Sequence, residues 1–139
     1  MDANKVGSLL PQQFGGILLG KLIAANMNVT TDQQITMFSN PSKFVLRRIV
    51  VTNASTSLST AAGGIYTAVS KGGTAVVAAS QAYSTLTTSA LFLDLTLNTA
   101  SSANITVKSS VPNLYLSLTT AQGGAATADV YVYGDILEA

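Results

Sequence analysis

Residue types that could carry out chemistry are scarce in this sequence. Its 139 residues include no His, no Cys and no Trp. Their absence excludes zinc sites of the usual kind, Ser-His-Asp and Cys-His nucleophiles, and disulfide bonds. Hydrolysis by two carboxylates stays formally open, because it needs only a pair of Asp or Glu side chains. The acidic residues available for it are Asp2, Asp32, Asp94, Asp129, Asp135 and Glu138.

The placement of these carboxylates argues against a catalytic pair. Asp94 and Asp129 occupy outward positions of segments in which apolar and polar residues alternate, so we expect both side chains to be solvated. Asp135 and Glu138 lie close to the C-terminus, where a charged side chain is easily tolerated. We therefore expect no enzymatic activity, no metal site and no cofactor.

Charge is sparse over the whole chain. Charged residues make up 9% of it, compared with roughly 25% in an average soluble domain. Apolar residues make up 47%, which is enough to fill the core of one domain. A monomer with so few charges lacks solubilising surface, so we expect a subunit that lies against other subunits, most simply a homodimer. The net charge of +1 is too small for non-specific nucleic-acid binding.

The segments that would position any site show the period of two that is typical of β-strands. Apolar residues alternate with mostly polar or aromatic ones in residues 91–97, 114–119 and 129–136, which indicates strands with one buried face. Further candidate strands are residues 34–38, 44–53, 65–70, 75–79 and 104–108. About eight short antiparallel strands over residues 31–139 predict a two-sheet sandwich, with a jelly roll favoured. An immunoglobulin-like sandwich is the alternative, although such domains usually carry a core Trp or a Cys pair.

Residues 1–30 form a separate apolar segment, which we assign as an N-terminal arm. Its glycines, Gly20 among them, give a flexible backbone that disfavours a helix, and the apolar run 17–25 is far too short to span a membrane. Two alternatives remain open: the segment docks on a neighbouring subunit, or it forms a first strand packed on the chain's own core. If the segment docks on a neighbouring subunit, we expect that deleting residues 1–25 leaves a folded sandwich that binds its partner subunits more weakly. The large apolar side chains that would make the contact are Leu9, Leu10, Phe14, Ile17, Leu18, Leu19 and Leu22.

Two further groups of residues are candidates for an interface. Arg47 and Arg48 are neighbours on a predicted strand, so alternation points them to opposite faces. They would form either an ion pair with a carboxylate of a partner or a pair of solvated charges near a strand end. Tyr115, Tyr131 and Tyr133 combine apolar rings with polar tips. This combination suits an interface better than a sugar-binding platform, which usually relies on Trp.

Four stretches of the sequence resemble one family of viral proteins. They are residues 26–35 (NMNVTTDQQI), 49–55 (IVVTNAS), 63–68 (GGIYTA) and 114–121 (LYLSLTTA). In these strand and turn sequences the chain is similar to the jelly-roll capsid cement, or decoration, proteins of tailed bacteriophages. The likeness extends over most of residues 26–133.

The resemblance implies a structural virion protein that is made in the host cytoplasm and binds the outer surface of a shell of major capsid protein. Such a protein stabilises the shell by bridging its subunits, often as a dimer, and the family implies no catalytic residue. The alternative from a different class is a sugar- or receptor-binding module, such as a head fibre or an adhesin. A cement protein is expected to bind capsids and no glycan, and an adhesin is expected to do the reverse.

Overall fold

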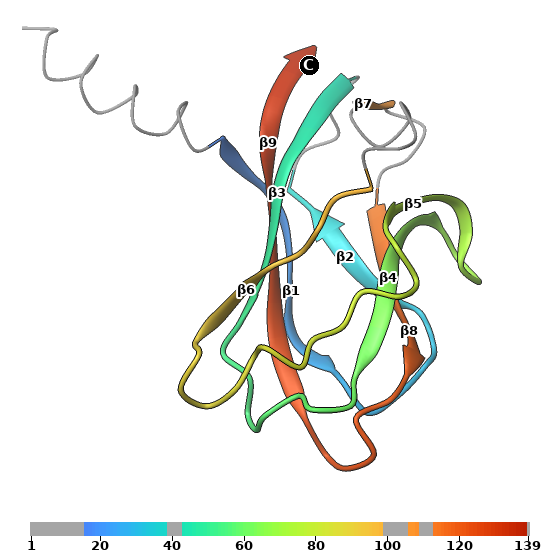
Figure 1. The fold of residues 1–139 in the computed structure, drawn as a ribbon. Coiled ribbons are helices and arrows are strands. Elements are labelled where there is room, and N and C mark those ends of the chain that lie inside the picture. Colours follow the sequence, from blue (N-terminus) through green and yellow to red (C-terminus); the bar gives the residue numbers. More distant parts are fainter. Residues whose placement is uncertain (1–15, 39–42, 99–105, 109–112, 139) are drawn as a thin grey trace, which may run out of the picture.

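The computed structural model describes residues 16–38, 43–98, 106–108 and 113–138. Within these ranges the chain is all β, with nine strands and no helix (Figure 1). The described part of the chain therefore offers no helical segment able to span a bilayer. The strands are β1 (Ile17–Asn26), β2 (Gln33–Met37), β3 (Lys43–Thr52), β4 (Ala62–Ala68), β5 (Gly72–Val77), β6 (Phe92–Asp94), β7 (Thr106–Lys108), β8 (Asn113–Thr120) and β9 (Thr127–Glu138).

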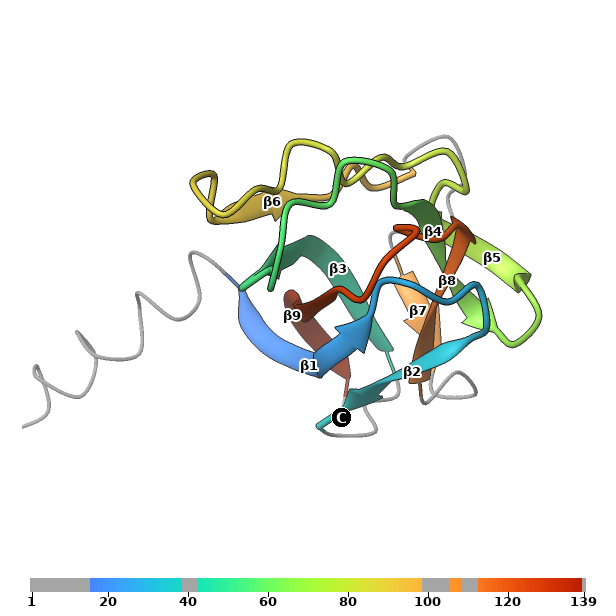
Figure 2. The ribbon, with the colours of Figure 1, turned by 90° about the horizontal axis from the view of Figure 1, so that it is seen from below.

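The strands pair antiparallel and belong to one sheet. Its order is β5-β4-β8-β2-β1-β9-β3-β6, and β7 also pairs with β3. The sheet curls around the core, so that its two halves face each other (Figure 2). The all-β antiparallel prediction is confirmed, but the described residues form a single curled sheet where the sequence predicted two. Alternation could not distinguish these arrangements, because both of them bury one face of every strand.

The curl brings the two ends of the sheet together. Val77 in β5 forms an isolated bridge with Leu97, which follows β6, and the Asn98 N–H donates to the Val76 carbonyl at 2.8 Å. The end strands are therefore joined through backbone contacts just beyond β6. This contact shortens the edges that the sheet would otherwise leave open to another chain.

Side chains from both halves of the sheet and from the connections fill one core. Ile49 in β3, Leu116 in β8 and Val132 in β9 are all fully buried, as the alternation of these strands predicts. Tyr83, from the connection between β5 and β6, is the largest fully buried side chain, and its hydroxyl donates to the Gly63 carbonyl at 3.2 Å. Burial raises the pKa of the Tyr83 hydroxyl. The ring thus fills the core while its polar group keeps a partner.

β1 is a central strand of the sheet, with β2 on one side and β9 on the other. Lys21 in β1 is the Cα partner of both Thr36 in β2 and Tyr131 in β9, and Leu19 packs into the core. Of the two alternatives for residues 1–30, the strand packed on the chain's own core therefore describes Ile17–Asn26. The remaining apolar candidates of that segment, Leu9, Leu10 and Phe14, lie outside the described residues.

Gly20 serves close packing, where the sequence suggested a flexible backbone. A Cβ at this position would lie 2.7 Å from both the Met37 Sδ and the Thr36 carbonyl oxygen of β2. Only glycine lets β1 and β2 approach this closely without displacing β2. Gly20 therefore marks a tight contact between two strands.

Candidate interaction surfaces

The outward side chains of five neighbouring strands form a continuous row across the sheet. Asp94 (β6), Val50 (β3), Tyr131 (β9), Lys21 (β1) and Thr36 (β2) are successive Cα partners in the antiparallel registers. Cross-strand partners share a face, so these five side chains project from the same side, away from the core. We call this side the outer face. Each of the five is exposed or half-buried.

One end of the outer face carries an exposed contact between a cation and an aromatic ring. The Lys21 Nζ lies 5.7 Å from the centre of the Phe38 ring, and Phe38 remains 53% exposed. Ile23, two residues after Lys21 in β1, is also about half exposed. We call Lys21, Ile23 and Phe38 the Phe38 patch. Lys21 forms no ion pair with any described carboxylate, so its charge remains available to an anionic group of a partner.

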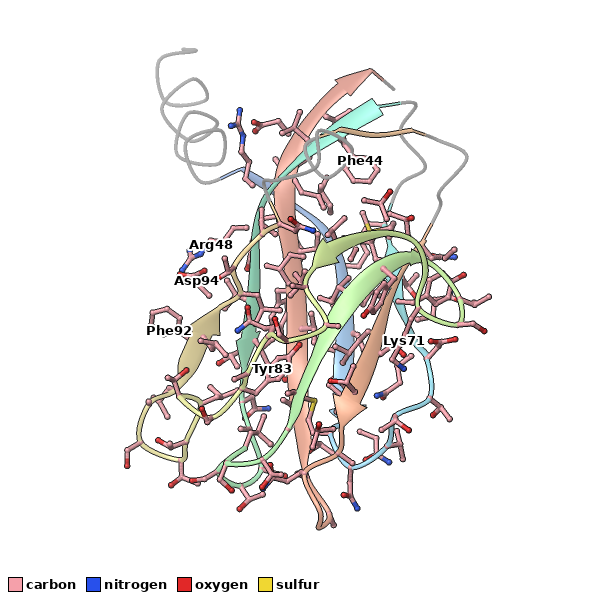
Figure 3. All side chains as sticks on the ribbon, turned by 45° about the vertical axis from the view of Figure 1, so that its right-hand side comes forward. Phe44, Arg48, Lys71, Tyr83, Phe92 and Asp94 are labelled. Atoms are coloured by element: carbon pink, nitrogen blue, oxygen red, sulfur yellow. The ribbon has the colours of Figure 1, made fainter. Side chains whose placement is uncertain are left out.

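The other end of the outer face carries a second such contact. The Arg48 Nη2 donates to the Asp94 Oδ2 at 2.9 Å while its Nε donates to Oδ1, and the guanidinium lies 6.0 Å from the centre of the Phe92 ring. Leu91 and Phe92 are 67% and 58% exposed, more than any other large apolar side chain in the described ranges. Figure 3 shows Phe92, Arg48 and Asp94 projecting from one side of the molecule. We call Arg48, Leu91, Phe92 and Asp94 the Phe92 patch.

A β-bulge in β3 changes the predicted orientation of the two arginines. The register between β3 and β9 shifts between Leu46 and Arg48, and Arg47 and Arg48 are both exposed. The expectation that they point to opposite faces is wrong, because the extra residue of a bulge interrupts strict alternation. Arg47 forms an ion pair with Asp135 at 2.6 Å, and Arg48 forms one with Asp94. Exposed pairs of this kind stabilise a fold by about 1 kcal/mol or less.

The three predicted interface tyrosines do not lie together. Tyr131 and Tyr133 are half-buried on the outer face, and Tyr133 is the Cα partner of Arg48. Tyr115 lies on β8, and β2 and β1 separate that strand from β9. Tyr131 and Tyr133 therefore belong to a surface that spans the Phe38 and Phe92 patches, and Tyr115 does not.

The apolar candidates of β1 also divide between two environments. Leu18 is half-buried on the outer face as the Cα partner of Tyr133. Leu19 and Leu22 pack in or against the core, and Ile17 lies partly exposed at the start of the strand. Leu19 and Leu22 are thus core residues and are not available to another subunit.

Asp129 is buried, where the sequence predicted a solvated carboxylate. Its side chain is on the outward side of β9, yet the residue is 8% exposed. Its Oδ1 accepts a hydrogen bond from the Ala24 N–H at 2.7 Å, and its Oδ2 accepts one from the Asn53 Nδ2 at 3.0 Å. The sequence holds no sign of this site, because a shift in register of β1 against β9 brings the Ala24 N–H to the carboxylate. Asp94, in contrast, is exposed as predicted.

Lys71, Ser117 and Asp32 form a polar cluster that sequence reasoning missed. The Lys71 Nζ donates to the Ser117 Oγ at 2.9 Å and to the Thr30 carbonyl at 3.3 Å. The Asp32 Oδ2 accepts from the Ser70 N–H at 2.7 Å, which lowers the pKa of Asp32. A lysine beside a serine can activate a nucleophile, but Ser117 is fully buried and no substrate reaches its hydroxyl. The cluster instead fastens the loop after β1 to the β4–β5 hairpin.

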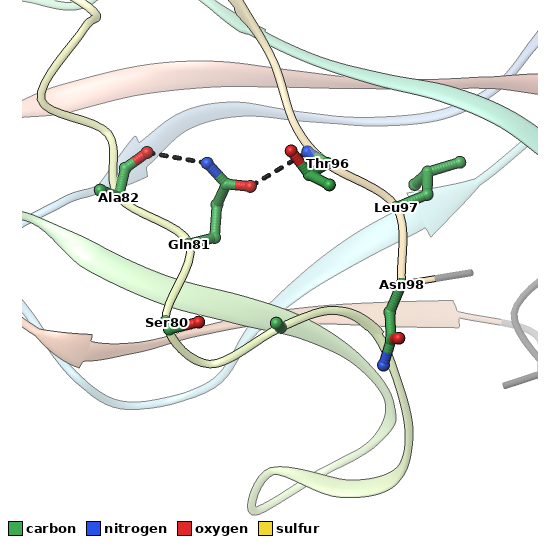
Figure 4. Close-up of a pocket in the computed structure, with 7 residues that line it drawn as sticks. Ser80, Gln81, Ala82, Thr96, Leu97 and Asn98 are labelled. Atoms are coloured by element: carbon green, nitrogen blue, oxygen red, sulfur yellow. Dashed lines mark hydrogen bonds between the residues drawn. The ribbon is translucent and has the colours of Figure 1, made fainter. Parts of the chain in front are cut away.

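A groove of 480 Å³ lies between the segments 78–82 and 96–98 (Figure 4). The Gln81 Oε1 accepts from the Thr96 N–H at 3.0 Å, and the Gln81 Nε2 donates to the Ala82 carbonyl at 2.8 Å. The Asn98 Nδ2 donates to the Ala75 carbonyl at 3.2 Å. Both amides are thus engaged with the chain's own backbone, and they hold the ends of the sheet together.

Comparison with known proteins gives no relative for this chain. No protein-family model matches it, and no curated protein or solved structure matches it either. Within the described ranges, no group of three or more acidic side chains is placed to hold a metal ion.

Proposed function

We propose that this chain is a structural virion protein, a capsid cement or decoration protein of a tailed bacteriophage. In this proposal it is made in the host cytoplasm, binds the outer surface of a shell of major capsid protein and stabilises that shell by bridging subunits. The jelly-roll form of such proteins is part of the proposal, with the two facing halves of the curled sheet in the place of two sheets. Support comes from the four sequence stretches described above and from the outer face.

The observation that carries the proposal is the Phe38 patch. It combines an exposed ring and an exposed aliphatic side chain with Lys21, a cation that has no described acidic partner. Phe38 and Ile23 are about half exposed, so covering them would contribute roughly 1 kcal/mol each before the costs of association. The contact between Lys21 and Phe38 strengthens when water is excluded, to about 2 kcal/mol. A shell surface that presents a carboxylate beside apolar side chains fits this patch.

The low charge of the chain fits a protein present in many copies on one particle. Each contact of this size is weak by itself, because association costs offset most of the gain from burial. Copies that bridge neighbouring subunits act together, since the second contact forms at a high effective concentration. Modest patches on each copy are therefore enough to stabilise a closed shell.

Binding to shells tests this function directly. Purified protein is mixed with shells of the major capsid protein encoded in the same genome, and the mixture is sedimented. The wild-type chain is expected to sediment with the shells and to raise their melting temperature. The double variant Lys21→Glu/Phe38→Ser is expected to bind at least about tenfold more weakly, because it removes roughly 1.4 kcal/mol or more of contact energy. The matched control is Val69→Ser, which changes an equally exposed side chain on the β4–β5 hairpin.

The same preparation separates the cement protein from the adhesin alternative. If the wild-type protein does not bind shells but binds an immobilised glycan, the proposal is overturned in favour of a sugar-binding module. Equal shell binding by the wild type and the Lys21→Glu/Phe38→Ser variant would show that the Phe38 patch is not the docking surface.

A further inference from the structure

We infer that the Phe92 patch binds the same patch of a second copy of this chain, across a two-fold axis. The inference concerns a different surface from the Phe38 patch and does not depend on the proposed function. It rests on three properties of the surface around Phe92: its exposed apolar side chains, its shape and its charge. A two-fold contact needs each of them to be self-complementary, because the same surface is used twice.

The apolar side chains are the first property. Leu91 and Phe92 are consecutive and are the most exposed large apolar side chains in the described ranges. The Arg48 guanidinium packs near the Phe92 ring and holds it in an outward position. In a two-fold contact the paired Leu91 and Phe92 side chains of both copies leave water together, which gives four apolar groups at the centre of one small interface.

Shape is the second property. A hollow of 240 Å³ lies beside the patch and is lined by Thr52, Asn53, Ala54, Thr87, Thr88 and Leu91. Thr52 is the Cα partner of Phe92, so the projecting ring and the hollow lie next to each other on one surface. A two-fold axis that passes between the ring and the hollow places the Phe92 of each copy at the hollow of the other. A surface that had only a projection, or only a recess, could not pair with itself in this way.

Charge is the third property. Arg48 and Asp94 lie side by side in the patch, joined by two hydrogen bonds. Rotation about a two-fold axis places the Arg48 of one copy toward the Asp94 of the other, and the reverse. Opposite charges then meet twice, whereas a patch of one sign would repel its copy. The side chains already form an exposed ion pair, so little further ordering is needed on association.

Charge exchange between two variants tests this contact. Wild-type protein is expected to dimerise in sedimentation over a range of concentrations. Arg48→Glu makes both charged positions acidic, and Asp94→Arg makes both basic, so each variant alone is expected to dimerise on the order of a hundredfold more weakly. An equal mixture of the two variants is expected to recover the dimer, because each copy then offers the sign that the other lacks.

Two controls keep this result specific to the patch. Arg47→Glu and Asp135→Arg make the same changes in a second ion pair of the described residues, which joins β3 and β9, and they are expected to leave the dimer intact. Phe92→Ser keeps Arg48 and Asp94 but removes the ring, and it is expected to dissociate the dimer. Its circular dichroism spectrum should be unchanged, which shows that the fold is intact. A wild-type chain that stays monomeric, a variant mixture that stays monomeric, or an equal loss in the Arg47→Glu control would overturn the inference.

Discussion

The carboxylate of Asp129 accepts a hydrogen bond from the backbone N–H of Ala24 where the register of β1 against β9 shifts. Ala24 has a φ of 55°, and Asn53, whose side chain donates to the same carboxylate, has a φ of 56°. The left-handed region is unfavourable for L-residues, and for alanine in particular. Asp129 therefore supports the unfavourable backbone conformation of Ala24 in β1 and also binds the side chain of Asn53, which directly follows β3.

Replacing Asp129 should destabilise the fold. Asp129→Ala leaves the Ala24 N–H and the Asn53 Nδ2 without their acceptor, and we expect a loss of about 2–3 kcal/mol in the free energy of unfolding. Urea denaturation measures this loss. The matched control is Asp135→Ala, which removes a partly exposed carboxylate from the same strand, outside both patches, and should change stability by about 1 kcal/mol or less. Equal losses in both variants would contradict the role assigned to Asp129.

Glycine at position 24 should stabilise the fold. The left-handed conformation costs alanine about 1–2 kcal/mol and glycine almost nothing, while the greater entropy of glycine in the unfolded chain opposes the gain by about 0.5–1 kcal/mol. We therefore expect Ala24→Gly to raise the free energy of unfolding by up to about 1 kcal/mol. Ala25→Gly, at a buried position whose φ is not positive, should destabilise. A loss of stability in both variants would argue against strain at Ala24.

The N-terminal region should divide into two parts in a truncation experiment. A chain lacking residues 1–15 keeps all nine described strands, so we expect a cooperative thermal transition and an unchanged β-type circular dichroism spectrum. A chain lacking residues 1–25 loses nearly all of β1, which leaves β2 and β9 without their common neighbour. We expect that chain to aggregate or to lose its cooperative transition. A folded, soluble chain without residues 1–25 would restore the arm hypothesis.

Stability should depend on pH through Asp32. The Ser70 N–H, followed by the Ser117 side chain and the charge of Lys71, lowers the pKa of Asp32 below its ordinary value of 3.8. A lowered pKa means that the fold favours the charged carboxylate, so its contribution is present above pH 3.8 and is lost as the pH falls through the folded-state pKa. Asp32→Asn should therefore be less stable than the wild type at neutral pH.

The pH profile of that variant distinguishes this role from a general loss of packing. The difference between the wild type and Asp32→Asn in the urea midpoint should shrink as the pH falls from neutral to about pH 2. Asp135→Asn serves as a control at a partly exposed carboxylate outside the cluster and outside both patches. A difference that stays constant over the whole pH range would show that the carboxylate charge of Asp32 contributes nothing.

The sequence predicted the strands whose buried face repeats without interruption. In β8 and β9 the inward leucines and valines, such as Leu116 and Val132, lie in the core as predicted, whereas Ile136, which the same alternation placed inward, is 38% exposed. β1 lacks so clear a signal, because Gly20 and Lys21 interrupt its apolar run and its register shifts twice against β9. The number of sheets also escaped prediction, since alternation records which face is buried and not how the strands curl.

The outer face was only partly predictable, because the pattern of a single strand does not show which strands become its neighbours. Tyr131, Tyr133 and Arg48 were recognised from residue type, and alternation along each strand was enough to place the tyrosines outward. Phe92 and Phe38 were not identified, and the alternation over residues 91–97 wrongly placed Leu91 on a buried face, because an exposed apolar residue looks the same in a sequence as a buried one. Pairs such as Arg48 and Asp94 depend on which strands become neighbours, and single-strand patterns hold no information on that.

The position of β9 in the sheet has a consequence for how the chain folds. Of the described strands β9 is the last to be synthesised, yet it lies between β1 and β3, which are among the first. Those two strands cannot complete their hydrogen bonds until β9 has left the ribosome, so the native sheet forms late and through contacts between distant parts of the sequence. Folding with such contacts is slow, on the order of milliseconds to seconds. During that interval β1 and β3 both present unpaired backbone, and premature termination before residue 127 would leave them in that state permanently.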